Sequence, residues 1–284
     1  MADASLTTAL QGVRAFVLDA DGVLLYRGVP IPGAVGAIET LKRRRIPYRV
    51  VTNFSSSHRA TLARVFADAT GLPAEPELII TAASAAAAYT ASHHPGAALY
   101  VLAQPDALRE WKGQRVLTPD EAAARGAHVD AVVIGDAGDA LSYRNLDIAF
   151  RHVRAGAAFI AMHRNPWWMT ERGITLDAGS LVAGLEFALG KRAVISGKPS
   201  PVVFREAVAE LRGDVRAAGG AALRLRDVAM VGDDPQADVA AAKRVGLRGL
   251  LVLSGKVDAD AAAAAKPRPD AVAASLAEIV ARLP

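Results

Sequence analysis

Two aspartates in close succession follow an apolar run near the amino end of the chain. The run is Phe16–Leu18, the acids are Asp19 and Asp21, and Gly22 follows them. Because burying an unpaired carboxylate in a parallel strand is costly, Asp19 should mark the end of the strand. Side chains alternate along extended backbone, so both carboxylates point to one side, where they could bind a metal ion or transfer protons. Taken alone, the stretch is as consistent with an Asp–Gly turn.

Three further stretches place polar residues directly after an apolar run. They are Thr52 and Asn53 after YRVV, Lys198 in ISGKP, and Asp233 with Asp234 in MVGDD. Each has a simple explanation as a helix cap, a surface lysine or a turn. Because the carboxyl ends of parallel strands lie along one edge of a sheet, we expect these residues to gather with the first two aspartates. Their joint occurrence favours a single site.

Short apolar runs alternate with segments of helical periodicity. Strands are expected at 13–18, 48–52, 78–81, 99–102, 131–135, 159–162, 193–195, 228–231 and 249–253. Helices are expected at 34–44, 57–70, 84–92, 142–154, 180–189, 201–211 and 238–245. This alternation predicts βαβ units around a parallel sheet, which is an α/β fold.

The middle of the chain holds too much expected structure to be a loop. We therefore predict a Rossmann-like parallel-sheet core domain, built from residues 1–80 and 183–284, with a second α/β domain inserted at 81–182. The strand at 193–195 is expected to return to the core sheet, and the helix at 180–189 could belong to either domain.

Composition narrows the class of protein. The 284 residues are 52% apolar and include no cysteine, which excludes disulfides, thiolate metal sites and a cysteine nucleophile. The net charge is +4, and the Lys and Arg residues that carry it are scattered along the chain. Their one tight run, at 42–45, lies at the end of an expected helix, where the helix dipole favours cations. No apolar run approaches the ~20 residues that span a bilayer. These features predict a cytoplasmic protein that binds neither nucleic acid nor membrane.

The four stretches together resemble the motifs of the haloacid dehalogenase-like (HAD) phosphohydrolase superfamily. Its motifs are DxDG, a strand ending in Thr or Ser, a Lys, and GD with further acids, and each has a counterpart here. The segments DGVLL, VTNFSSS, ISGKPSPVVF and VGDDPQAD extend the resemblance to subclass IIA, the NagD and p-nitrophenylphosphatase-like group. The phospholysine/phosphohistidine phosphatase-like branch of this group is the one that residues 161–190 resemble most, with the sequence AMHRNPWWMTERGITLDAGSLVAGLEFALG.

The resemblance implies a magnesium-dependent phosphatase that acts on a small phosphorylated substrate. Asp19 would be the nucleophile that forms an aspartyl-phosphate, which splits one difficult step into two. Asp21 would protonate the leaving oxygen and later take a proton from water. Mg²⁺ would be held by the carboxylates of Asp19 and Asp233 and the backbone carbonyl of Asp21.

The other motif residues would neutralise and bind the phosphoryl group. Lys198 would offset the negative charge of the nucleophile and phosphate, while Thr52 and Asn53 would bind phosphoryl oxygens. Asp234 and Asp238 could orient Lys198 or hold metal-bound water, although Asp238 could equally begin a helix.

By the same resemblance, the inserted domain would be a cap that excludes water and carries specificity. Its substrate loop reads close to ATNPD in the subclass, whereas here His163, Arg164 and Asn165 precede a proline and no Asp is present. His163 or Arg164 could bind an anionic leaving group, or His163 could satisfy a local hydrogen bond. Trp167 and Trp168 are expected to pack within the cap rather than to stack on a substrate.

Three other functions could use similar residues. A phosphotransferase of the mutase type shares the four motifs, but the segment between Asp21 and Asn53 is too short for the small cap of that type. A non-enzymatic receiver-like module shares the parallel sheet but needs no cap and no second aspartate. A degenerate binding protein is disfavoured because no motif residue is missing. The identity of the substrate stays open, and relatives that dimerise through the cap suggest a possible homodimer.

Overall fold

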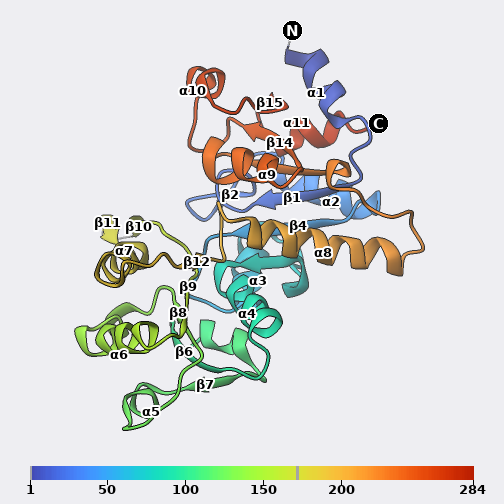
Figure 1. The fold of residues 1–284 in the computed structure, drawn as a ribbon. Coiled ribbons are helices and arrows are strands. Elements are labelled where there is room, and N and C mark those ends of the chain that lie inside the picture. The colour runs from blue at the N-terminus through green and yellow to red at the C-terminus, as the bar shows by residue number, and fades with distance from the viewer. Residues whose placement is uncertain (1, 171–172) are drawn as a thin grey trace. The chain divides into compact units, whose positions relative to one another are not determined.

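The computed structural model describes residues 2–170 and 173–284. The chain forms two compact units, each with its own sheet (Figure 1). The first comprises Met1–Thr52, Leu62–Ile80 and Lys198–Pro284, and the second comprises Asn53–Thr61 and Thr81–Gly197. The predicted α/β class is confirmed.

The first unit is built on a six-stranded sheet in the order β15-β14-β13-β1-β4-β5. The central strand β1 pairs in parallel with β13 on one side and with β4 on the other. The strands are β1 (Ala15–Asp19), β4 (Tyr48–Thr52), β5 (Ile79–Thr81), β13 (Val228–Gly232), β14 (Arg248–Val252) and β15 (Ala271–Ala273). Every residue of β1, β4 and β13 is buried, as is typical of parallel strands covered on both faces.

Helices and short turns connect these strands. They are α1 (Ala2–Leu10), α2 (Ala34–Arg43), α3 (Arg59–Thr70), η1 (Pro76–Leu78), α8 (Pro201–Ala217), η4 (Leu225–Asp227), η5 (Pro235–Ala240), α9 (Ala241–Arg244), α10 (Ala259–Ala264) and α11 (Leu276–Ala281), with a small hairpin of β2 (Leu25–Tyr26) and β3 (Val29–Pro30). Helix α2 buries Ala34, Ala37 and Leu41, whose spacing places them on one helix face. Lys42 and Arg43 occupy its last turn, where the helix dipole favours positive charge.

Alternation along β4 divides its side chains between the two faces of the sheet. Tyr48, Val50 and Thr52 point to one face because they are two residues apart. Arg49 points to the other face, where its guanidinium forms ion pairs of 2.6 and 2.7 Å with two carboxylates of α8. The ion pairs therefore attach α8 to that side of the strand.

The second unit has a five-stranded sheet in the order β12-β9-β8-β6-β7. Its strands are β6 (Ala98–Leu102), β7 (Arg115–Leu117), β8 (Ala131–Ile134), β9 (Ala158–Ala161) and β12 (Val194–Ile195), with a hairpin of β10 (Trp167–Thr170) and β11 (Gly173–Leu176). Its helices are α4 (Ala82–His93), η2 (Ala107–Trp111), α5 (Pro119–Ala123), η3 (Gly138–Ala140), α6 (Tyr143–Arg154) and α7 (Ala178–Leu189). Tyr100, Trp111 and Phe159 are among its buried side chains.

One strand lies in a different sheet from the one expected. The segment 193–195 was expected in the core sheet, but β12 pairs with β9 through Val194 with Ile160 and Ile195 with Ala161. The second unit consequently continues to Gly197, beyond the expected boundary at 182. A two-residue strand carries too little pattern to indicate which sheet it joins.

Within the described ranges, none of the helices combines the length and apolar character that crossing a bilayer requires.

Candidate active site

Asp19 ends the central strand of the first unit, as expected. Its side chain is buried, and its Oδ1 atom accepts a hydrogen bond of 2.7 Å from the backbone N–H of Ala20. The same oxygen lies 2.6 Å from Nζ of Lys198. Burial raises the pKa of the Asp19 carboxyl, Lys198 opposes that rise, and nearby Asp233 and Asp21 add to it. Asp19 is thus a carboxylate placed in an enclosed, charged environment.

Lys198 lies between two carboxylates. Its Nζ atom is 2.6 Å from Asp19 and 2.8 Å from Asp238, and its side chain is only 4% exposed. Burial lowers the pKa of Lys198, but the two carboxylates outweigh burial and raise it above its usual value. The lysine therefore remains a fixed positive charge beside Asp19. It was expected after a strand of the core sheet, whereas it follows β12 of the other sheet and is the first residue of the returning chain.

Asp238 is the partner that holds Lys198 from the other side. The residue is fully buried, and its Oδ2 atom accepts a hydrogen bond of 3.1 Å from the backbone N–H of Asp234. Burial and the charge of Asp19 raise the pKa of Asp238 to about 7, against the opposing effect of Lys198. These contacts support the orienting role for Asp238. It is Asp234 that caps η5, by accepting from the N–H groups of Gln236 and Ala237 at 2.9 Å each.

Asp233 sits between two glycines after β13. Its Oδ2 atom accepts a hydrogen bond of 2.9 Å from the backbone N–H of Lys256. A Cβ atom at either Gly22 or Gly255 would overlap the Asp233 carboxylate, so both positions need glycine for this close approach. The Oδ1 atom is buried and has no hydrogen-bond partner among the described residues. An oxygen in this state lacks a donor or a cation.

Three carboxylates of the first unit could hold a metal ion together. Oxygens of Asp19, Asp233 and Asp238 lie within 4.8 Å of one another, and all three residues are buried. Hard divalent cations prefer such oxygen ligands, and the unpartnered Oδ1 of Asp233 would gain its missing contact from one. The residues present therefore fit a divalent cation.

Gly255→Ala tests this arrangement. The added methyl group would displace the Asp233 carboxylate, so we expect divalent-cation affinity to fall at least tenfold, measured by isothermal titration with Mg²⁺. Gly36→Ala is the matched control, because a Cβ at that helix position meets nothing within 4 Å. Equal affinities in the two variants would contradict the role assigned to Asp233.

Asp21 lies at the turn that follows Asp19, and it is exposed to solvent. Partial loss of surrounding water raises the pKa of its carboxyl, while Lys198 and Lys256 oppose the rise. The turn is fixed by a hydrogen bond of 2.7 Å from Gly22 N–H to the Leu25 carbonyl. A carboxyl in this environment is suited to proton transfer.

The two residues expected to bind phosphoryl oxygens fall in different units. Thr52 is buried at the end of β4, where the preceding residue, Val51, pairs with Asp19 in the sheet. Asn53 begins the second unit. The structure thus places Thr52 next to the strand end that carries Asp19.

His163 is buried in the second unit among local partners. Its Nε2 atom is 2.9 Å from Oγ of Ser55 and 3.7 Å from a carboxylate oxygen of Asp177. Burial lowers the pKa of His163, and the neighbouring carboxylates oppose that change. His163 therefore has a hydrogen-bond partner within its own unit, as one of the two interpretations of this residue expects.

The next two residues of that segment have different surroundings. Arg164 forms an ion pair of 2.7 Å with Glu186, although its side chain is 40% exposed. Asn165 is half-buried, and its backbone N–H donates to Nδ1 of His163 at 3.3 Å. Of the three candidate residues, Arg164 alone combines a positive charge with substantial exposure.

The tryptophans of β10 do not pack as expected. Trp167 is 54% exposed and Trp168 is 38% exposed. The prediction that they pack inside the second unit is wrong, because the hairpin of β10 and β11 forms a separate two-stranded sheet.

Comparison with known proteins identifies the family. The model described as "Haloacid dehalogenase-like hydrolase" matches residues 16–116, and the "HAD-hydrolase-like" model matches residues 195–279. The human phospholysine phosphohistidine inorganic pyrophosphate phosphatase is 31% identical over 253 residues, which cover 87% of this chain and 85% of the relative. The chain belongs to the haloacid dehalogenase-like hydrolase superfamily.

Two solved structures resemble this HAD hydrolase over nearly its whole length. The 4-nitrophenylphosphatase of Thermotoga maritima has a TM-score of 0.82 and 25% identity, over 97% of this chain and 99% of its own. The glycerol phosphate phosphatase of Mycobacterium tuberculosis, solved in complex with magnesium, has a TM-score of 0.79 and 30% identity, over 95% of this chain and 77% of its own. These relatives confirm the assignment to subclass IIA and identify this HAD hydrolase as a phosphatase enzyme.

Some contributors to the site were not identified from sequence. Gly255 and Lys256 act through the position of their backbone beside Asp233. Ser55 is a partner of His163 from a distant part of the sequence, and Asp177 is a partner from the following segment. Asp177 does carry a local signal, because it caps α7 by accepting from the Ala178 N–H, but a cap signal does not indicate a histidine partner.

Proposed function

We propose that this HAD phosphatase is magnesium-dependent and hydrolyses a small phosphorylated metabolite through an aspartyl-phosphate intermediate. The observation that carries the proposal is the arrangement around Asp19, which is buried with Lys198 at 2.6 Å. The same site holds Asp233, whose buried Oδ1 has no partner among the described residues. A nucleophile, a fixed cation and an open ligand oxygen are the parts that phosphoryl transfer requires.

Asp19 and Asp21 would divide the chemistry between them. A carboxylate oxygen of Asp19 would form a bond to phosphorus while the bond from phosphorus to the leaving oxygen breaks. Asp21, whose pKa is raised, would give its proton to that leaving oxygen. The same carboxylate would then take a proton from the water that attacks phosphorus, which releases phosphate and restores Asp19.

Lys198 and Thr52 would stabilise the phosphoryl group during transfer. Lys198 stays charged between its two carboxylates and so offers a preorganised positive charge at the reacting atoms. Thr52 ends the strand beside Asp19 and would donate to a phosphoryl oxygen. Asn53 is proposed to contact phosphoryl oxygens as well.

Asp19 and Asp233, with the backbone carbonyl of Asp21, are proposed to hold Mg²⁺. When bound, the ion would neutralise negative charge on the phosphoryl oxygens. Support comes from the oxygen-only donor set and from the 30% identical glycerol phosphate phosphatase solved with magnesium. Asp238 would keep Lys198 in place rather than act as a catalytic group.

The second unit is proposed to be a cap that supplies specificity through residues His163–Asn165. Arg164 has the exposed charge to contact an anionic part of the substrate, whereas His163 would position the segment through Ser55. The relatives are named for phospholysine, phosphohistidine and inorganic pyrophosphate, for 4-nitrophenyl phosphate, or for glycerol phosphate, which supports a small phosphorylated substrate. A homodimer is proposed only by analogy with relatives.

Hydrolysis of p-nitrophenyl phosphate tests the proposed function. With Mg²⁺ we expect p-nitrophenol and inorganic phosphate in equal amounts, no activity after chelation, and recovery when Mg²⁺ is restored. Adding glycerol as an acceptor of the phosphoryl group distinguishes hydrolysis from phosphotransfer. Nitrophenol released in excess of phosphate would identify a phosphotransferase, and activity that survives chelation would contradict the metal requirement.

A further inference from the structure

The carboxyl of Asp21 depends on the backbone of its turn for its position. Asp21 is exposed, and among the described residues no hydrogen-bond partner orients its side chain. A general acid must lie within hydrogen-bond reach of the oxygen that it protonates. The groups that hold the peptide units next to Asp21 should therefore affect how well it donates a proton.

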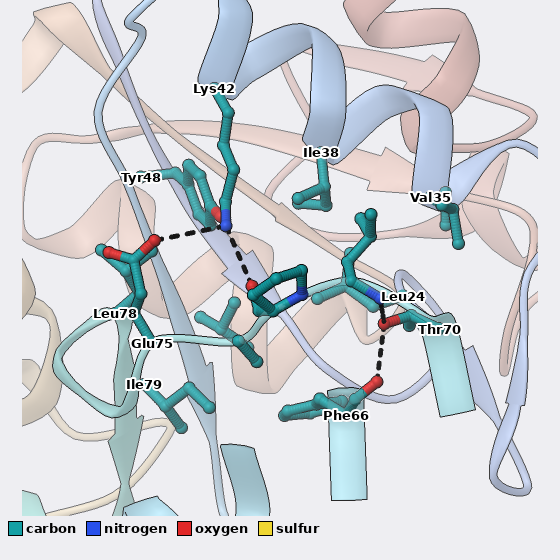
Figure 2. A pocket seen from close by; sticks show the side chains of 15 residues that line it. Leu24, Val35, Ile38, Lys42, Tyr48, Phe66, Thr70, Glu75, Leu78 and Ile79 are labelled. Atoms are coloured by element: carbon teal, nitrogen blue, oxygen red, sulfur yellow. Dashed lines mark hydrogen bonds and ion pairs between the residues drawn. The ribbon is translucent and has the colours of Figure 1, made fainter. Parts of the chain in front are cut away.

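The two ends of this turn are anchored in the first unit. Strand β1 leads into it, and the N–H groups of Leu24 and Leu25 both donate to the Ala20 carbonyl, at 2.9 and 3.0 Å. Leu24 is buried and lies beside side chains of α2 and α3, such as Ile38 and Phe66, around a small apolar pocket (Figure 2). Packing and backbone hydrogen bonds thus fix the ends of the turn and leave its middle to other contacts.

Gly22, in the middle of the turn, is held from three sides. Its N–H donates to the Leu25 carbonyl at 2.7 Å, and a Cβ atom on it would overlap the Asp233 carboxylate. Its carbonyl accepts a hydrogen bond of 2.6 Å from Oγ of Ser254, which lies 232 positions away in the sequence. The N–H and the carbonyl of Gly22 belong to the two peptide units that follow Asp21. Because each unit is planar, fixing both restricts the backbone of Asp21.

Ser254 begins a short segment after β14 that contacts both acidic turns of the site. Its own side chain is half-buried. The next residue, Gly255, lies against the Asp233 carboxylate, and the backbone N–H of Lys256 donates to Oδ2 of Asp233 at 2.9 Å. The Nζ atom of Lys256 is 3.3 Å from a carboxylate oxygen of Asp234. These three residues therefore join the turn after β1 to the turn after β13.

We propose that Ser254 is a positioning residue for Asp21, which holds the carboxyl where it can protonate the leaving oxygen. The inference rests on the proposed function, because it requires Asp21 to be the general acid. The proton passes from the Asp21 carboxyl to the ester oxygen as the bond from phosphorus to that oxygen breaks, and Asp21 becomes a carboxylate. A turn without the Ser254 hydrogen bond would hold Asp21 less accurately, which slows the reaction where the leaving oxygen needs the proton.

Two substrates with different leaving groups test the proposal. Phenolate is a basic leaving group that needs a proton, whereas 2,4-dinitrophenolate leaves readily without one. We would measure kcat/KM for phenyl phosphate and for 2,4-dinitrophenyl phosphate at saturating Mg²⁺, because this constant includes the step that breaks the ester bond. In Ser254→Ala we expect kcat/KM to fall about tenfold for phenyl phosphate and less than about twofold for the dinitrophenyl ester. General damage to the site would lower both values alike.

Two further serine variants serve as controls. Ser254→Thr keeps the hydroxyl and should keep the parental ratio of the two kcat/KM values. A threonine variant as selective in its loss as the alanine variant would contradict the role of the hydroxyl. Ser275→Ala makes the same chemical change at a half-buried residue of the same unit, whose side chain forms no cap hydrogen bond to α11. It should leave the ratio unchanged, while circular dichroism and thermal unfolding check that each variant is folded.

Asp21→Asn separates failure of this inference from failure of the proposed function. If Asp21 is the general acid, this variant should lose roughly 100-fold more kcat/KM with phenyl phosphate than with the dinitrophenyl ester. If it does so while Ser254→Ala slows both substrates equally or slows neither, Ser254 does not position Asp21 and the proposed function stands. If Asp21→Asn itself slows both substrates equally, the proposed role of Asp21 and the role of Ser254 are both wrong.

Discussion

Asp19→Asn is expected to reduce turnover of p-nitrophenyl phosphate to less than about one hundredth of the wild-type rate. The substitution keeps the size of the side chain but removes the charged oxygen that would attack phosphorus. Burial raises the pKa of Asp19, which shows that the charged form is costly to bury. The neutral asparagine avoids that cost, so the fold should persist. Steady-state kinetics at saturating Mg²⁺ measures the effect, with circular dichroism and thermal unfolding as checks on structure.

Asp68→Asn is the matched control for this experiment. Asp68 is exposed on α3 of the same unit, so the same chemical change there should leave turnover unaltered. Titration of the Asp19 variant with Mg²⁺ separates loss of the nucleophile from loss of a metal ligand. If Asp19→Asn retains more than about a hundredth of the wild-type activity, the nucleophile has been misassigned.

Lys198→Met is expected to have two large effects. Removing the fixed cation beside the reacting phosphoryl group should lower kcat by about 100- to 1000-fold. It should also destabilise the metal-free protein by about 3 to 5 kcal/mol, because Asp19 and Asp238 would be left buried without their shared partner. Urea unfolding measures the second effect. Saturating Mg²⁺ should reduce it, since bound cation restores positive charge near the carboxylates.

Lys112→Met is the corresponding control, because Lys112 is exposed and should affect neither quantity. Equal unfolding free energies for Lys198→Met and the parent protein without Mg²⁺ would show that the buried ion pairs contribute little. Normal kcat in that variant would remove Lys198 from the proposed mechanism.

The fold of the core was predictable where sequence pattern and local environment agree. The runs at β1, β4 and β13 are mostly apolar, with Arg49 inside β4 and the polar residues Asp19 and Thr52 at strand ends, and all three strands are buried in the sheet. Strand β12 was assigned to the wrong sheet, because the pattern of two residues does not indicate which strand they pair with. Helices α1 and α11 and strand β15 were not predicted, since short segments at the ends of a chain gain their structure mainly from packing.

In the candidate site, too, residues marked by a local sequence motif were predicted, whereas contacts between residues distant in sequence were not. Asp19, Asp21, Lys198 and Asp233 stand out because each follows an apolar run in a recognisable motif. The role of Asp238 was left open between orienting Lys198, holding metal-bound water and beginning a helix, because its contact with Lys198 joins residues distant in sequence. Likewise, the exposure of Trp167 and Trp168 follows from a hairpin that local hydrophobicity does not predict.

The charge of the buried cluster has a thermodynamic consequence. When ionised, Asp19, Asp233 and Asp238 carry three negative charges, and Lys198 offsets one of them. A phosphate dianion would be repelled by this excess, whereas a divalent cation would cancel it. Substrate and cation should therefore strengthen each other's binding by the same factor, as linkage requires. If the cluster binds a cation as proposed, its acidic excess would therefore disfavour phosphate binding to the metal-free protein.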